Sequence, residues 1–170
     1  MTTRTFATWV QPIAEEFRSA RVHVLQFARS AGDELWEQPS GVERWTCKDI
    51  MSHLAAGTSK QFQTLLRSVT TRTRLDPDLF GHGDEVNARD VEERRSQPID
   101  TMIDEYETDT DELLGLLSQL TEEDQGRRQK DFEQSFGEAL PIFAEHEHEH
   151  LRQLRGGRAI DDNANVPAVG

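Results

Sequence analysis

The chain has 170 residues, the size of one domain, and its 32 acidic residues outnumber its 19 basic residues, which gives a formal net charge of −13. This balance argues against nucleic acid and against anionic membranes as partners, because both require a cationic protein surface. No apolar run approaches the roughly 20 residues of a membrane span. The single cysteine, Cys47, excludes an internal disulfide, so we expect a cytoplasmic protein.

The first predicted element is an amphipathic helix that becomes regular at about Gln11. Apolar residues recur at steps of three and four from Trp9 to Phe27, which is the spacing of one helix face. Gly32 ends this pattern, and a loop rich in turn-forming residues follows it.

A second helix is predicted from Thr46 to about Val69. Thr46 is a good N-cap, and Asp49 places a carboxylate in the first turn, where the helix dipole favours a negative charge. A long loop over about residues 70–83 and a short polar helix over about residues 84–93 then connect to the second half of the chain.

Two further long helices are predicted in the second half. Ser96 is expected to cap the third helix, in which apolar residues hold the helical step from Met102 to Leu120. After a polar connection, the fourth helix runs from about Phe136 to Leu154 and ends before a glycine pair.

This pattern predicts an all-α fold. Four long helices without a strand pattern or an internal repeat indicate a four-helix bundle over residues 1–156, of the up-and-down type with a long crossover connection. Residues 157–170 lack periodicity, and we expect them to form a disordered tail.

Three of the six histidines are predicted to meet inside the bundle. At about 100° per residue, His146 and His150 share one face of the fourth helix, whereas His148 points to the other side. His53 lies on the apolar face of the second helix. One divalent metal would satisfy all three imidazoles and leave a coordination position open. The alternative is a set of core histidines that are each hydrogen-bonded to a neighbour; an i, i+4 pair with a third histidine favours the metal.

The same segment matches the His-Glu-x-x-His pattern of zinc metalloproteases, in which Glu147 would be the general base. The extended motif requires glycine at 153 and histidine at 156, where this chain has Gln153 and Gly156, and no glutamate follows His150. A metal-dependent hydrolase is therefore an alternative. Glu147 is also a candidate partner for an imidazole or a proton shuttle, against a solvated position on the surface.

Two segments together resemble the DinB-like superfamily: Trp-Thr-Cys-Lys-Asp-Ile-Met-Ser-His-Leu at residues 45–54, and His-Glu-His-Glu-His-Leu-Arg-Gln-Leu at residues 146–154. Within it, the chain is most similar to the metal-binding domain of the mycothiol-dependent maleylpyruvate isomerase group. The resemblance implies a DinB-like four-helix bundle in which His53, His146 and His150 hold one divalent metal, zinc first, then nickel or iron. It also implies a low-molecular-weight thiol, mycothiol or bacillithiol, as cofactor or co-substrate.

Asn87 stands where the isomerase group often carries an asparagine, and the resemblance carries it over as a catalytic residue on the substrate side. The maleylpyruvate isomerase itself has a glutamate in place of His146 and an additional carboxyl-terminal domain, so maleylpyruvate is not the substrate that we expect here. Sixteen of the 19 basic residues are arginine, which suggests a GC-rich host and favours mycothiol over bacillithiol.

The predicted function is thiol S-transfer or thiol-dependent isomerisation of a small electrophile. Besides the hydrolase, the alternative is a non-catalytic, metal-stabilised binding module of the stress response. Dimers are frequent among relatives, so a homodimer is an expected partner state.

Three other residues near the second helix have two interpretations each. Cys47 lies in the first turn, where the helix dipole would lower its pKa and create a reactive thiolate; a small space-filling role is the alternative. Trp36 and Trp45 either line the pocket or close the end of the core.

Overall fold

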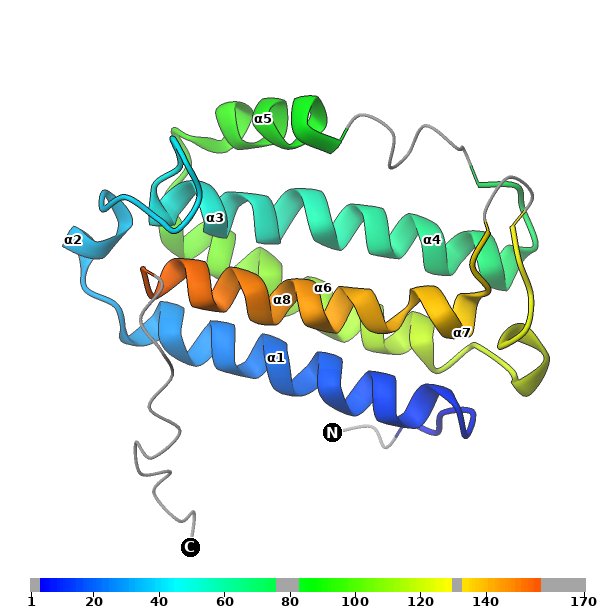
Figure 1. Ribbon diagram of the computed structural model, residues 1–170. Helices are drawn as coiled ribbons and strands as arrows, with labels where there is room; N and C mark the ends of the chain where they lie inside the picture. Colours follow the sequence, from blue (N-terminus) through cyan, green and yellow to red (C-terminus); the bar gives the residue numbers. More distant parts are fainter. Residues whose placement is uncertain (1–3, 76–82, 130–132, 157–170) are drawn as a thin grey trace, which may run out of the picture.

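The computed structural model describes residues 4–75, 83–129 and 133–156, and its long helices lie side by side in one bundle (Figure 1). The long elements are α1 (Val10–Ser30), α3 (Cys47–His53) continued by a π-helical turn (Leu54–Thr58) and α4 (Ser59–Thr71), α6 (Ile99–Leu117), and α8 (Pro141–Leu154). The short ones are α2 (Asp33–Trp36), α5 (Gly83–Arg94), a 3-10 turn (Glu122–Asp124) and α7 (Phe136–Ala139). The described residues form helices and two isolated bridges but no strand, which confirms the predicted all-α class.

Two of the long helices, α4 and α6, run side by side in the same direction (Figure 1). Gln63 on α4 donates to Asp109 on α6 (3.3 Å), and one turn further along both helices Arg67 pairs with Glu112, so α4 and α6 are parallel. The connection between α4 and α6 makes this arrangement possible, because its helix α5 leads back along the outside of the bundle. This is the predicted long crossover connection.

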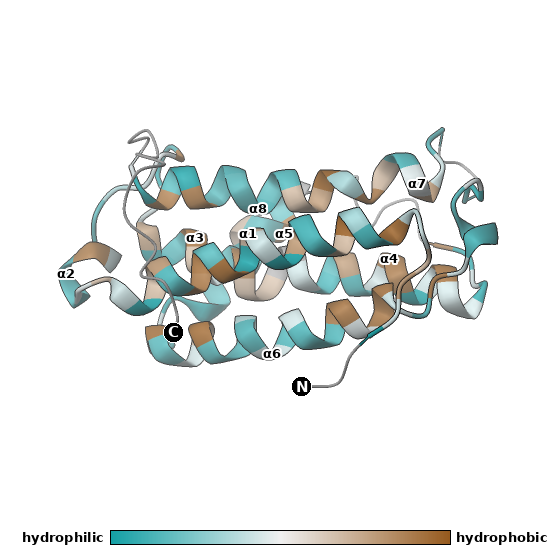
Figure 2. Cartoon of the chain, turned by 90° about the horizontal axis from the view of Figure 1, so that it is seen from below, coloured by the Kyte–Doolittle hydropathy of each residue, from teal (hydrophilic) through white to brown (hydrophobic). Residues whose placement is uncertain are grey.

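The apolar faces of the helices form two separate clusters along the bundle. One cluster surrounds Phe17, Phe62 and Leu113, and the other surrounds Ile50 and Met102. Figure 2 shows hydrophobic and hydrophilic residues in alternation along the long helices, as expected for helices with one buried face. The histidines and several buried polar side chains belong to neither cluster.

The structure corrects two helix boundaries. The third long helix has Pro98 as its N-cap, with φ −61° and ψ 143°, and not Ser96, because the residue before a proline is disfavoured in helical conformation. The predicted fourth helix is divided into α7 and α8 at Leu140, next to Pro141, which occupies the first helical position where a missing N–H is tolerated.

Two other differences concern the first half of the chain. The second helix contains a π-helical turn directly after His53, and the predicted loop after Gly32 includes the four-residue helix α2. The predicted tail over residues 157–170 lies outside the described residues. Among the residues that are described, no helix combines the length and the apolar character needed to cross a membrane.

Candidate metal centre

The start of α3 fixes the position of His53. Thr46 and Asp49 form the predicted N-cap as a reciprocal capping box: the Asp49 N–H donates to Thr46 Oγ1 at 3.2 Å, and the Thr46 N–H donates to Asp49 Oδ2 at 3.0 Å. His53 ends this short helix and is only 3% exposed. The indole ring of Trp45 lies against it, with ring centroids 5.4 Å apart. The capping box thus sets the direction in which the His53 imidazole enters the bundle.

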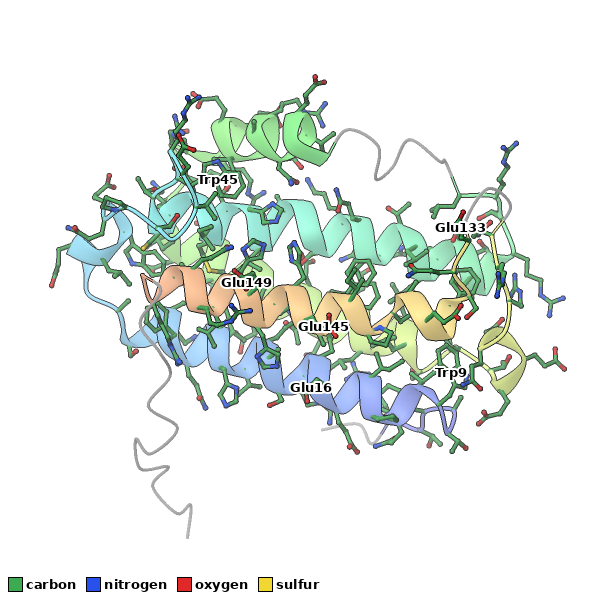
Figure 3. All side chains as sticks on the ribbon, in the orientation of Figure 1. Trp9, Glu16, Trp45, Glu133, Glu145 and Glu149 are labelled. Carbon is green, nitrogen blue, oxygen red and sulfur yellow. The ribbon has the colours of Figure 1, made fainter. Side chains whose placement is uncertain are left out.

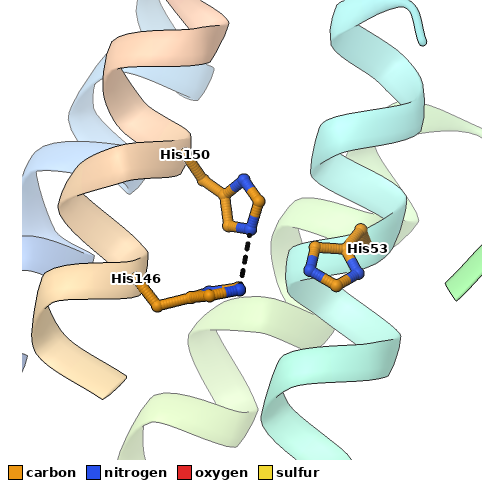
Figure 4. A group of neighbouring side chains, drawn as sticks. All are labelled: His53, His146 and His150. Carbon is orange, nitrogen blue, oxygen red and sulfur yellow. Dashed lines mark hydrogen bonds between the residues drawn. The ribbon is translucent and has the colours of Figure 1, made fainter. Parts of the chain in front are cut away.

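Helix α8 presents the other two histidines on one face, one turn apart. The ring centroids of His146 and His150 are 4.2 Å apart, and the ring of His53 lies 4.8 Å from that of His150 and 5.5 Å from that of His146. Figure 4 shows the three imidazoles facing one another across the space between α3 and α8. One nitrogen from each ring lies within 4.8 Å of the others, so the three predicted ligands converge and could hold a metal ion.

Hydrogen bonds define the tautomer of His150. Gln153 Nε2 donates to Glu149 Oε1 at 3.0 Å, which leaves Gln153 Oε1 as the acceptor for His150 Nδ1 at 2.6 Å. The proton of His150 is therefore on Nδ1, and the Nε2 lone pair faces the centre of the cluster. In metal sites, the imidazole nitrogen that does not bind the metal commonly donates its N–H to an acceptor, which fixes the orientation of the ring.

Burial keeps the three imidazoles neutral at pH 7. Desolvation and the neighbouring His150 and His146 lower the pKa of His53 from 6.5 to about 3, and desolvation and His146 lower the pKa of His150 to about 4. The pKa of His146 is also lowered, mainly by burial. A metal requires imidazoles in the neutral form, so this environment favours ligation over protonation.

The spacing of the α8 pair fits a metal ion. Zn–N bonds of 2.0–2.1 Å at a tetrahedral angle separate two ligand nitrogens by about 3.3 Å, and His146 Nε2 lies 3.2 Å from His150 Nε2. The other ring nitrogen of His146, Nδ1, is buried and has no hydrogen-bond partner among the described residues. His146 is half-buried, whereas His53 and His150 are buried.

The structure does not bring Glu147 to the imidazoles. Its side chain is fully buried, Oε1 accepts from Arg21 Nη1 at 3.3 Å, and Oε2 accepts from the Tyr106 hydroxyl at 2.5 Å. The solvated position is therefore wrong, and neither carboxylate oxygen is free to serve as a general base beside the histidines. Position 147 lies about 100° around α8 from position 146, and its carboxylate meets Arg21 on α1 and Tyr106 on α6.

Asn87 lies on α5. This helix packs against α3, which ends at His53, and against the π turn that follows it. Its side-chain Oδ1 is buried and has no hydrogen-bond partner among the described residues. A buried amide oxygen without a partner is uncommon in a folded protein. Asn87 therefore retains an unused acceptor on the helix that covers the histidine-bearing segment.

The remaining predictions on this region have clear outcomes. Cys47 is buried, with Sγ 3.6 Å from the Leu154 carbonyl, and burial raises its pKa, so it fills space and is not a reactive thiolate. Trp36 closes the end of the core, whereas Trp45 contacts His53. His148 points away from the cluster and meets Glu16 on α1, with His148 Nε2 2.7 Å from Glu16 Oε1. Figure 3 shows Trp45 above α3 and Glu149 on α8, both in the same half of the bundle.

Sequence reasoning missed two residues in this region: Gln153, which contacts His150, and Arg21, which contacts Glu147. Gln153 follows His150 by three positions, the spacing at which helix side chains meet, and this was the available signal for its role. Arg21 lies on the apolar stripe of α1, between Phe17 and Val24, and is completely buried. A charged residue within an apolar stripe indicates a buried partner.

Comparison with known proteins supports the fold. The family model described as the DinB superfamily matches residues 16–154, which include all three histidines. No curated protein and no solved structure matches the chain.

Proposed function

The chain belongs to the DinB superfamily, and we propose that it is a metal-dependent enzyme that transfers a low-molecular-weight thiol to a small electrophile or uses that thiol to isomerise it. The observation that carries the proposal is the convergence of three neutral imidazoles from two helices, with nitrogens within 4.8 Å of one another. Three protein ligands are the number found in catalytic sites that keep a position for substrate.

The metal-binding residues would be His53, His146 and His150. Imidazole donors suit zinc, nickel and iron, and three histidines are a ligand set found in catalytic zinc sites. A divalent metal, when bound, supplies the positive charge that deprotonates a coordinating thiol at neutral pH. The protein contributes the rest: burial keeps the ligands unprotonated, and Gln153 directs the Nε2 lone pair of His150.

The thiol is proposed on the basis of the family resemblance of residues 45–54 and 146–154. Mycothiol is favoured over bacillithiol because the arginine-rich composition suggests a GC-rich host. In the transfer reaction, the thiol loses its proton to solvent, its sulfur forms a C–S bond with the electrophilic carbon, and the leaving group departs with the electron pair. Asn87 is proposed to bind the substrate through its buried, unpartnered Oδ1.

The position of Glu147 favours thiol chemistry over hydrolysis. A hydrolase of the His-Glu-x-x-His type needs its glutamate beside the metal as general base. Here both oxygens of Glu147 accept hydrogen bonds from Arg21 and Tyr106. A thiol that is deprotonated by the metal charge needs no such base.

The first experiment measures the metal content of untagged protein by plasma mass spectrometry. We expect close to one metal per chain in the wild type, and loss of the metal in His53→Ala, His146→Ala and His150→Ala. His148→Ala is the matched control, because this histidine lies on the same helix but contacts Glu16 on the surface. A wild-type protein that stays metal-free after reconstitution would refute the proposed metal centre.

The second experiment measures turnover of monobromobimane with mycothiol by the metal-loaded protein, with bacillithiol and with buffer as comparisons. We expect a rate above the uncatalysed reaction, with bromide as the leaving group. Asn87→Ala is expected to lower kcat/KM by about tenfold, the value of roughly one hydrogen bond, without changing the metal content. No acceleration with either thiol would refute thiol transfer to this class of electrophile.

A further inference from the structure

Four buried side chains with polar groups form a layer across the bundle where the two hydrophobic clusters meet, and one of them, Tyr106, also belongs to the cluster around Ile50 and Met102. They are Arg21 on α1, Ser59 at the start of α4, Tyr106 on α6 and Glu147 on α8, and we call them the mid-bundle polar layer. All four have 0% exposure. Each of the long helices therefore contributes one residue to a polar layer that is sealed from solvent.

Arg21 is the centre of this layer. Its Nη1 donates to Glu147 Oε1 at 3.3 Å, and its Nη2 donates both to Ser59 Oγ at 3.1 Å and to the Tyr106 carbonyl at 3.0 Å. The guanidinium also lies over the Tyr106 ring, 3.7 Å from its centroid. The Tyr106 hydroxyl closes the network by donating to Glu147 Oε2 at 2.5 Å. One side chain thus connects three other helices.

The network joins both segments that carry the histidines. Glu147 directly follows His146 on α8 and precedes His150 by three residues. On the other side, the Ser59 hydroxyl donates at 3.0 Å to the carbonyl of Leu54, the first residue of the π turn and the neighbour of His53. Arg21 therefore links α8 and the π turn through hydrogen bonds on the inner side of the bundle.

A buried charge pair constrains the register of the helices more strongly than apolar packing does. Apolar side chains tolerate exchange of one neighbour for another, whereas a buried carboxylate or guanidinium without its partner is strongly unfavourable. A rotation or axial shift of α8 would separate Glu147 from Arg21 and Tyr106 and place its charge against the hydrophobic clusters. The same shift would move His146 and His150 away from His53.

We propose that Arg21 is a positioning residue that, through Glu147, Tyr106 and Ser59, holds α8 and the π turn in the register at which the three imidazoles converge on a metal. This inference rests on the metal centre of the proposed function. It assigns Glu147 to the geometry of that centre and not to acid–base chemistry.

The test measures the affinity of the metal-free protein for Co²⁺ through its d–d absorption, with the free energy of unfolding measured in parallel. The main variant is the double substitution Arg21→Met/Glu147→Gln, which removes the charge pair without leaving a single buried charge. Tyr106→Phe removes only one hydroxyl from the layer and serves as the second variant. The matched control is Glu16→Gln, which removes the negative charge from the exposed contact of α1 with His148 on α8.

We expect the double variant to stay folded and to bind Co²⁺ about tenfold more weakly, within the range known for outer partners of metal ligands, with a changed d–d spectrum. Tyr106→Phe should weaken binding in the same direction, and Glu16→Gln should stay within about twofold of the wild type. A layer that only stabilised the fold would change unfolding without changing the affinity of the folded protein.

Unchanged Co²⁺ affinity in the folded double variant overturns the inference. If the double variant does not fold, unchanged affinity in Tyr106→Phe has the same meaning. Equal weakening in Glu16→Gln also overturns it, because any contact between α1 and α8 would then suffice. A wild type that binds no Co²⁺ refutes the metal centre itself, which is distinct from a wild type that binds while the variants are unaffected.

Discussion

The buried imidazoles predict a steep loss of stability of the metal-free protein below pH 7. His53 and His150 have pKa values of about 3 and about 4 in the folded protein, compared with 6.5 in the unfolded chain. Between these values the unfolded chain binds more protons than the folded protein does, so acid favours unfolding. With respect to these two groups, the free energy of unfolding is highest above pH 6.5 and falls as the pH falls. The loss is complete at about pH 3–4, where the imidazoles also become charged in the folded protein.

The magnitude follows from these values. At pH 5 both imidazoles are still neutral in the folded protein and almost fully charged in the unfolded chain, which costs about 2 kcal/mol for each between pH 7 and pH 5. The two together give about 4 kcal/mol, a large part of the roughly 5–15 kcal/mol that stabilises a typical domain. At about 2–4 °C per kcal/mol for a chain of this size, Tm should fall by about 8–16 °C.

Urea unfolding of EDTA-treated protein, followed by circular dichroism at pH 7, 6 and 5, measures this loss. The comparison is the double variant His53→Gln/His150→Gln, which should lose about 4 kcal/mol less than the wild type over the same interval. Burial raises the pKa of Glu147 and of Asp109, which acts in the opposite direction, but both groups remain in the variant and cancel in the difference. Equal losses in the two proteins would refute the conclusion that burial holds the imidazoles neutral.

Three further predictions concern the residues around the centre. Thr46→Ala removes the cap of α3 and should cost about 1 kcal/mol in urea unfolding; an unchanged midpoint would contradict the capping box. Phe62→Ala should cost about 3–5 kcal/mol, because Phe62 stacks on Phe143 with centroids 3.9 Å apart, and the metal content of the folded protein should not change. Cys47 should react with a disulfide reagent much more slowly in native protein than in urea, and Cys47→Ser should keep bimane turnover; fast native labelling would contradict its burial.

The sequence was sufficient to predict the elements that depend on local rules. Thr46 and Asp49 stand at the spacing of a capping box, and the box is formed. His146 and His150 are four residues apart on a helix, and they share a face because that spacing is fixed by helix geometry. His53 required one more assumption, that the apolar face of the second helix points to the same interior, and the convergence of the three rings confirms it.

Two features of the helices were not predicted from the sequence: the π turn after His53 and the start of α6. The π turn after His53 has no local sequence signal that separates it from an α-helix, and one observed contact to it is the hydrogen bond from Ser59 to the Leu54 carbonyl. Ser96 was a reasonable cap by residue type, but Pro98 restricts the backbone before it and moves the start of α6 to Ile99.

The sequence pattern of α8 alone does not determine that the Glu147 side chain points into the bundle. In the alternating Glu-His run at residues 145–150, every glutamate resembles a solvated residue, and one helical wheel cannot show which of them faces a neighbouring helix. The information lies in another helix: Arg21 interrupts the apolar stripe of α1, and a buried guanidinium requires a buried carboxylate. Of the glutamates in that run, only Glu147 is fully buried and meets Arg21. The fold thus uses the residue between the two histidines of α8 to place both of them.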